Sequence, residues 1–217
     1  MVTFSGRRPR KTFSDGQEHR VPMLIGNTAR DKIPGSPPPA DLEKVIRDQY
    51  GPIAERALAP YTGAPDTLYG TPAAQWAGDT SFRCTAVTQL LWHVAAGNPA
   101  YEYQFDRAAL GRELVGARHA TDMPYVFGTF EFVVSLPGQT VAFNDVDRTI
   151  SSVIQQYWTN FAKTGDPNDS KLPAWRKFDS ASRAYMEFTD AGPVSNEGLR
   201  RSYCDLFIEN TKRIGQK

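Results

Sequence analysis

The amino-acid sequence predicts an α/β protein, because segments with strand patterns alternate along the chain with segments of helical periodicity. Residues 21–26 are a short apolar run that ends in glycine, which is typical of a buried strand. In residues 100–106 aromatic side chains alternate with polar ones, which is the two-residue period of a strand. Residues 149–164 repeat apolar side chains at helical spacing and stop at Gly165. These two strands and this helix carry the predicted fold class.

The remaining elements are predicted from capping residues, stop signals and apolar periodicity. Asp41 is placed to cap a helix that Gly51 then ends. Further elements are expected as helices over 42–50, 79–96 and 196–213, a helical turn over 122–127, a strand over 185–188, and loops over 60–78 and most of 107–148.

Composition limits the classes of partner. The 217 residues include 25 Lys and Arg against 24 Asp and Glu, and this balance disfavours nucleic acid. No apolar run approaches the roughly 20 residues that span a bilayer, so no membrane span is expected. Residues 1–20 are expected to form an irregular basic leader, without the apolar stretch of a signal peptide, before a folded domain over residues 21–217.

The two cysteines, Cys84 and Cys204, lie far apart in stretches with helical patterns. A disulfide framework would need more cysteines in a shorter chain, so both are expected to be free and buried. A hydrolase that uses one of them as nucleophile, with His119 as base, is an alternative that the sequence leaves open.

His119 is the candidate general base, because it lies in a loop that follows a strand and has no apolar stripe to bury it. His19 is expected to be solvated, and His93 is expected to pack within a helix or face water.

Asp31 follows the first predicted strand and could orient the imidazole of His119, as the third member of a catalytic triad does. Asp106 and Asp122 compete for that role. The 217 residues contain no Gly-x-Ser-x-Gly nucleophile elbow, no Gly-rich oxyanion or phosphate loop and no metal-ligand spacing. No metal and no cofactor are therefore expected.

Four segments resemble the type-B carboxylesterases, the cholinesterase-like branch of the α/β-hydrolases. Residues 116–128, GARHATDMPYVFG, look like the catalytic-histidine segment of that family. Residues 154–168 are similar to its next helix and Gly-x-Pro-Asn turn, which Leu-Pro-Ala-Trp follows. Residues 21–26 and 99–106 resemble the strands that precede the acid and the histidine.

The resemblance covers about residue 12 to the end of the chain and implies the C-terminal part of an α/β-hydrolase fold. That part has about three sheet strands with flanking helices and long loops. Strands 21–26, 100–106 and 184–189 should be neighbours at one side of the sheet. The first would leave its outer edge open, so self-association is expected.

The resemblance also implies roles for individual residues. His119 matches the catalytic histidine, and Asp31 stands where the family usually has Glu, one methylene longer. Tyr125, Phe127 and Phe130 follow the histidine and are candidates either for substrate binding or for core packing. The family's serine elbow and oxyanion loop lie N-terminal to the acid and have no counterpart in these residues.

The expected chemistry of the parent family is hydrolysis of a small-molecule carboxylic ester: serine attacks the carbonyl, His119 takes its proton, and Asp31 orients His119. This chain would supply the histidine and the acid and would be inactive alone. A non-catalytic pseudo-enzyme, or half of a split esterase that needs a separate N-terminal chain, is the alternative. A shifted start or a frameshifted gene would explain the patternless first eleven residues.

Overall fold

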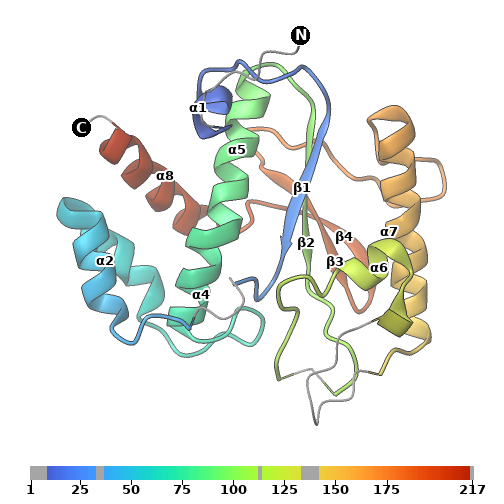
Figure 1. Cartoon of the computed structure of the whole chain (residues 1–217), viewed down its shortest axis with the longest axis horizontal. Coiled ribbons are helices and arrows are strands. Elements are labelled where there is room, and N and C mark those ends of the chain that lie inside the picture. The colour runs from blue at the N-terminus through green and yellow to red at the C-terminus, as the bar shows by residue number, and fades with distance from the viewer. Residues whose placement is uncertain (1–8, 33–36, 112–113, 133–141, 216–217) are drawn as a thin grey trace.

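A four-stranded mixed sheet organises the structure (Figure 1). The computed structural model describes residues 9–32, 37–111, 114–132 and 142–215. The strands follow the spatial order β1-β2-β3-β4, in which the first three are parallel and the last is antiparallel. Their bounds are Met23–Thr28 for β1, Ala100–Phe105 for β2, Ala184–Thr189 for β3 and Gly192–Glu197 for β4.

The predicted neighbourhood of the first three strands is confirmed by their register. Met23 pairs with Ala100 across β1 and β2, and Glu102 pairs with Tyr185 across β2 and β3. Parallel strands need long crossovers, and here these crossovers carry the helices. The carboxyl ends of β1 and β2 therefore lie side by side.

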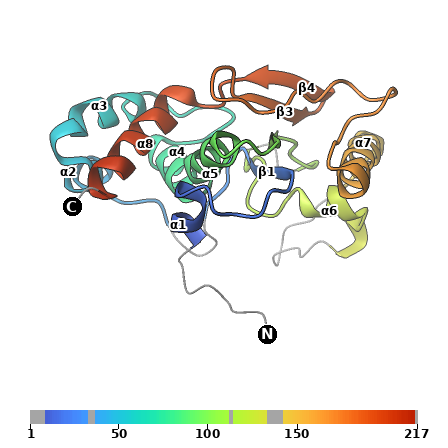
Figure 2. The same ribbon diagram turned by 90° about the horizontal axis from the view of Figure 1, so that it is seen from above.

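Helices cover both faces of the sheet, as Figure 2 shows, so the predicted α/β class is confirmed. Helices α5 and α8 pack on one face, and α7 packs on the other. The helices are α1 (Pro9–Ser14), α2 (Leu42–Tyr50), α3 (Ala54–Leu58), α4 (Pro72–Gly78), α5 (Cys84–Ala95), α6 (Met123–Phe127), α7 (Asp145–Thr164) and α8 (Arg201–Gly215). None of these described helices has the length and apolar character that crossing a membrane requires.

The α7 face holds an aromatic core centred on Trp175. Its indole N–H donates to the carbonyl of Glu102 at 3.0 Å, and its ring meets Tyr157 edge-on at 5.2 Å between centroids. Tyr101 and Phe188 complete the cluster from β2 and β3. These aromatic side chains therefore form part of the packed core.

The opposite face of the sheet buries a carboxyl group. Both side-chain oxygens of Glu102 are buried without a hydrogen-bond partner among the described residues. Burial raises the pKa of Glu102 to about 8, although the positive charges of Arg83 and Arg183 act in the other direction. Glu102 is therefore predominantly protonated at neutral pH.

The structure differs from the predicted elements in three places. Helix α4 lies in the region 60–78 that was expected to be loop, because Thr71 caps it and Pro72 suits its first turn. The C-terminal helix starts at Arg201 rather than at 196, because residues 192–197 form β4. A short helix, α1, lies inside the leader that was expected to be irregular.

The expectation of free cysteines is wrong. Cys84, at the start of α5, forms a disulfide with Cys204 of α8, with 4.8 Å between their Cα atoms. The two residues are 120 positions apart, so only the packing of α5 against α8 brings them together. With both sulfurs bonded, neither cysteine is available as a nucleophile.

Reduction of this disulfide should lower the free energy of unfolding by roughly 4 to 5 kcal/mol, because the bond closes a loop of more than 100 residues in the unfolded chain. Urea unfolding with and without a phosphine reductant measures the change. A Cys84→Ser, Cys204→Ser double variant is the control, since reductant should not move its midpoint. An unmodified chain whose midpoint ignores the reductant would contradict the prediction.

Candidate active site

The structure brings His119 and Asp31 together at the carboxyl ends of the parallel strands. The imidazole Nδ1 of His119 lies 2.7 Å from Oδ1 of Asp31, the distance of a hydrogen bond in which Nδ1–H donates to the carboxylate. Asp31 follows β1, and His119 lies in the connection after β2. Open α/β sheets place their ligand sites at this edge.

The acid is buried and the base is accessible. The side chain of Asp31 is 8% exposed, whereas that of His119 is 40% exposed. Burial raises the pKa of the Asp31 carboxyl above its ordinary value, and the hydrogen bond and charge of His119 act in the opposite direction. The backbone N–H of Thr28 also donates to Oδ2 of Asp31, at 3.3 Å.

The residues that carry Asp31 after β1, residues 29–32, which we call the acid loop, rest on the end of α4. A Cβ at Gly78 would come within 2.6 Å of the carbonyl oxygen of Asp31, so only glycine permits this close approach. Arg83 donates from Nη2 to the carbonyl oxygen of Ala29, at 2.7 Å. These contacts fix the backbone on both sides of Arg30.

Arg30 fixes the histidine loop, which we define as residues 114–122. Its backbone N–H donates to Ala117 at 2.8 Å, and its guanidinium donates to Leu114 at 2.6 Å. Gly116 has φ +71° and lies against the Arg30 side chain, where a Cβ would come within 2.7 Å. The acid loop and the histidine loop are thus joined directly.

Phe82 covers one face of the imidazole. Its ring is stacked on His119 with 5.0 Å between ring centroids and 29° between the ring planes. The sequence predicts Phe82 only as an apolar residue of a helix, because the contact depends on a loop that lies 37 positions later in the chain.

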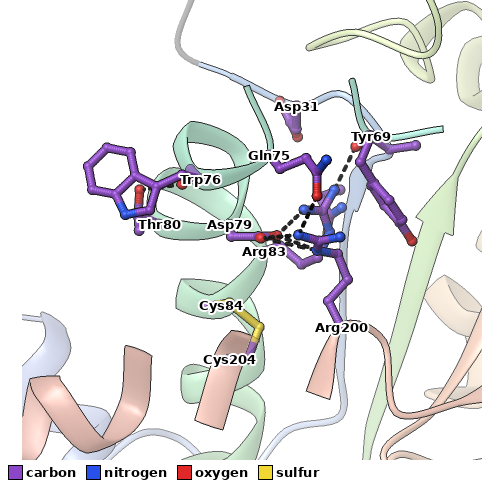
Figure 3. Close-up of polar contacts among 12 residues, drawn as sticks. Asp31, Tyr69, Gln75, Trp76, Asp79, Thr80, Arg83, Cys84, Arg200 and Cys204 are labelled. Carbon is purple, nitrogen blue, oxygen red and sulfur yellow. Dashed lines mark hydrogen bonds and ion pairs between the residues drawn. A yellow bond between two sulfur atoms is a disulfide. The ribbon is translucent and has the colours of Figure 1, made fainter. Parts of the chain in front are cut away.

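A buried ionic cluster lies beside the site (Figure 3). Asp79, 1% exposed, accepts hydrogen bonds from Arg83, from Arg200 and from the hydroxyl of Tyr61. Arg200 Nη2 lies 2.7 Å from Asp79 and also donates to Gln75 at 3.1 Å. The sequence does not predict this cluster, since its members come from separate segments without a common motif.

The other candidate acids have different partners. Asp122 accepts a hydrogen bond from the hydroxyl of Tyr103 at 2.9 Å. Asp106 lies at the end of β2, where burial raises its pKa to about 6. Asp31 is therefore the carboxylate that contacts His119.

The remaining histidines match the expectations for them. His19 is exposed. His93 is buried in α5, where its ring nitrogens lie 3.1 Å from Glu18 and 3.0 Å from the carbonyl oxygen of Val21.

The three candidate substrate-binding residues lie in different surroundings. Tyr125 is buried, and its hydroxyl donates to Asp147 at 2.6 Å, so it packs in the core. Phe127 is 66% exposed, and Phe130 packs against Tyr125 with 5.4 Å between ring centroids. Phe127 and Phe130 line a cavity of about 610 Å³ on α7, and His119 is not among its lining residues.

The described geometry suits proton transfer by an imidazole. A carboxylate holds Nδ1, and Nε2 has no hydrogen-bond partner among the described residues. This is the arrangement in which a histidine takes a proton from a hydroxyl nucleophile and returns it to a leaving group. The part of the chain that the structure describes holds no group of three or more His, Cys, Asp or Glu side chains placed to bind a metal.

Comparison with known proteins gives the family of this chain. Residues 38–207 match the carboxylesterase family, so the chain belongs to that family. The matched residues include His119 and begin after Asp31.

Similar proteins include several esterases. The chain is 26% identical over 208 residues to the medium-chain fatty acyl-CoA hydrolase precursor of Anas platyrhynchos, which covers 93% of this chain and 34% of that protein. It is 41% identical over 115 residues to the bile salt-activated lipase of Homo sapiens, covering 50% and 14%. It is 32% identical over 120 residues to acetylcholinesterase 1 of Caenorhabditis elegans, covering 52% and 18%. The chain thus spans about a third or less of these relatives.

Replacing Asp79 by Asn should lower the free energy of unfolding by about 3 to 5 kcal/mol, because Arg83 and Arg200 would keep buried charges without a carboxylate. Urea unfolding measures the loss. The matched control is Asp48→Asn, which breaks an exposed ion pair with Lys44 and should leave the urea midpoint nearly unchanged. Equal losses in the two variants would show that the Asp79 cluster is not a buried ionic unit.

Proposed function

We propose that this chain supplies the histidine and the acid of a Ser-His-Asp triad that hydrolyses carboxylic esters. The observation that carries the proposal is the 2.7 Å contact between His119 and Asp31 at the carboxyl edge of the sheet. The membership of the chain in the carboxylesterase family supports it.

In this proposal each residue has one role. His119 takes the proton of a serine hydroxyl on Nε2 while the serine oxygen attacks the ester carbonyl, and then gives that proton to the leaving alcohol. Asp31 holds the Nδ1–H tautomer and stabilises the imidazolium that forms. Water then attacks the acyl-enzyme with His119 again as base.

The nucleophile has to come from outside these 217 residues, since they contain no Gly-x-Ser-x-Gly motif. We propose that it lies in an N-terminal part of the same domain, on the same chain or on a separate one. A pseudo-enzyme that lacks turnover is the second candidate, and the absence of the motif from these residues favours it.

The substrate class is a small carboxylic ester. The names of the similar proteins, a fatty acyl-CoA hydrolase, a lipase and an acetylcholinesterase, have hydrolysis of an acyl bond in common.

The 217 residues alone should show no ester turnover and no labelling by a fluorophosphonate serine probe. Co-expression with the N-terminal portion of a related carboxylesterase, which carries the serine motif, should restore both. In that assembly Asp31→Asn should lower kcat by roughly 10⁴, because Asn favours the wrong imidazole tautomer. His19→Ala, which changes an exposed histidine outside the candidate site, should leave kcat unchanged.

Two results would contradict the proposal. Serine-probe labelling of the chain alone would place the nucleophile within these residues. A folded assembly that binds the probe but keeps full activity in His119→Ala would remove the histidine from the mechanism. A folded assembly without any turnover would favour the pseudo-enzyme.

We also propose that the outer edge of β1 is an association surface. Among the described strands β1 pairs only with β2. The N–H groups of Met23 and Ala29 donate toward β2, at Pro99 and Phe105, and successive residues of a strand alternate between its two sides. The N–H of Leu24 therefore faces the open edge.

Sedimentation of the chain alone should show mass that increases with concentration, because an unpaired strand edge recruits another strand. Leu24→Pro removes one outward N–H and should shift the equilibrium toward monomer. Circular dichroism checks that this variant still folds. A monodisperse monomer at high concentration in the unmodified chain would contradict the proposal.

A further inference from the structure

The aromatic ring beside His119 limits a motion that the hydrogen bond to Asp31 leaves free. The contact between Nδ1 and Asp31 fixes one atom of the imidazole. The ring can still pivot about that atom, and this motion would swing Nε2 through a wide arc. The stacked ring of Phe82 lies against one face of the imidazole, at 5.0 Å between centroids, and opposes rotation of the imidazole toward that face.

His119 has few other restraints. Its side chain is 40% exposed, and Phe82 is its only ring contact among the described residues. The next residue, Ala120, has φ 65°, in the left-handed region that alanine rarely adopts.

The backbone that carries Phe82 is anchored by its neighbours. It belongs to a π-helical turn over Asp79–Arg83, which we call the π-turn, between α4 and α5. Turns of this kind inside α-helices are frequent at functional sites. The buried cluster around Asp79 fixes the π-turn, and the guanidinium of Arg83 binds the carbonyl of Ala29 in the acid loop.

The same short stretch of helix therefore contacts both members of the pair. Gly78 lets the backbone of Asp31 approach, Arg83 binds that loop, and Phe82 stacks on His119. A rigid support that touches both groups fixes their relative placement better than two independent loops would.

We propose that Phe82 is a positioning residue, which sets the plane of the His119 imidazole and thereby the direction of Nε2. This inference rests on the proposed function for its purpose, since it assigns Phe82 to the proton-transfer step. The inference concerns the orientation of the imidazole ring, so it can be tested without ester turnover.

The test is nuclear magnetic resonance of the chain with isotope-labelled histidine. The sequence has only three histidines, and the signals lost in His119→Asn identify those of His119. A ring stacked on the imidazole face shifts the carbon-bound ring protons upfield. Phe82→Leu should remove that shift and should make exchange of the Nδ1–H proton with water roughly two- to tenfold faster. Phe82→Tyr keeps the aromatic face and should preserve both properties.

Phe13→Leu is the matched control, because Phe13 lies 6.1 Å from His93 between ring centroids. It should move the signals of His93 and leave those of His119 in place. Unchanged His119 signals in Phe82→Leu, or equal changes in Phe82→Tyr, would overturn the inference.

Nuclear Overhauser contacts in the unmodified chain give an independent measurement if Phe82→Leu does not fold. Contacts between the ring protons of Phe82 and His119 would support the inference, and their absence would overturn it. A failure to restore esterase activity in the assembly would bear on the proposed function and would leave these signals unaffected.

Discussion

The carboxylate of Asp79 is the interaction on which the arrangement of the site depends. It is buried where a charge is costly, and two guanidinium groups and a tyrosine hydroxyl compensate for that cost. Arg83 lies in the π-turn, and Arg200 is the residue directly before α8. One carboxylate thus links the helix beneath the site with the C-terminal helix. The disulfide of Cys84 with Cys204 ties the same two helices one residue beyond Arg83.

This link determines how the pair of His119 and Asp31 is supported. A histidine and a carboxylate on two loops keep a constant distance and orientation only if a rigid element of the fold contacts both loops. Here the loops contact each other through Arg30, and both contact the helix that Asp79 anchors. The contact between His119 and Asp31 is therefore held entirely by described residues.

The sequence predicted those parts of the fold that local chemistry determines. Helix α7 follows from its apolar spacing, and α2 begins after the predicted cap Asp41. The adjacency of His119 and Asp31 was implied by family resemblance, because 88 residues separate them and no local rule joins such positions. Strand β4 was missed because its residues are largely exposed and lack apolar alternation. Pairing of Cys84 with a distant partner depends on helix packing, which composition does not report.

The protonated carboxyl group of Glu102 makes folding of this chain a reaction that consumes a proton. In the unfolded chain its pKa is near 4.5, and in the folded chain burial raises its pKa to about 8. Between these values the unfolded chain is ionised at this position and the folded chain is not, so folding takes up one proton there. The folded state is favoured on the acidic side of this window and loses that advantage progressively as pH rises toward 8. A rise from about pH 4.5 to about pH 8 therefore weakens the sheet at its inner strand β2, at a residue outside the His119–Asp31 pair.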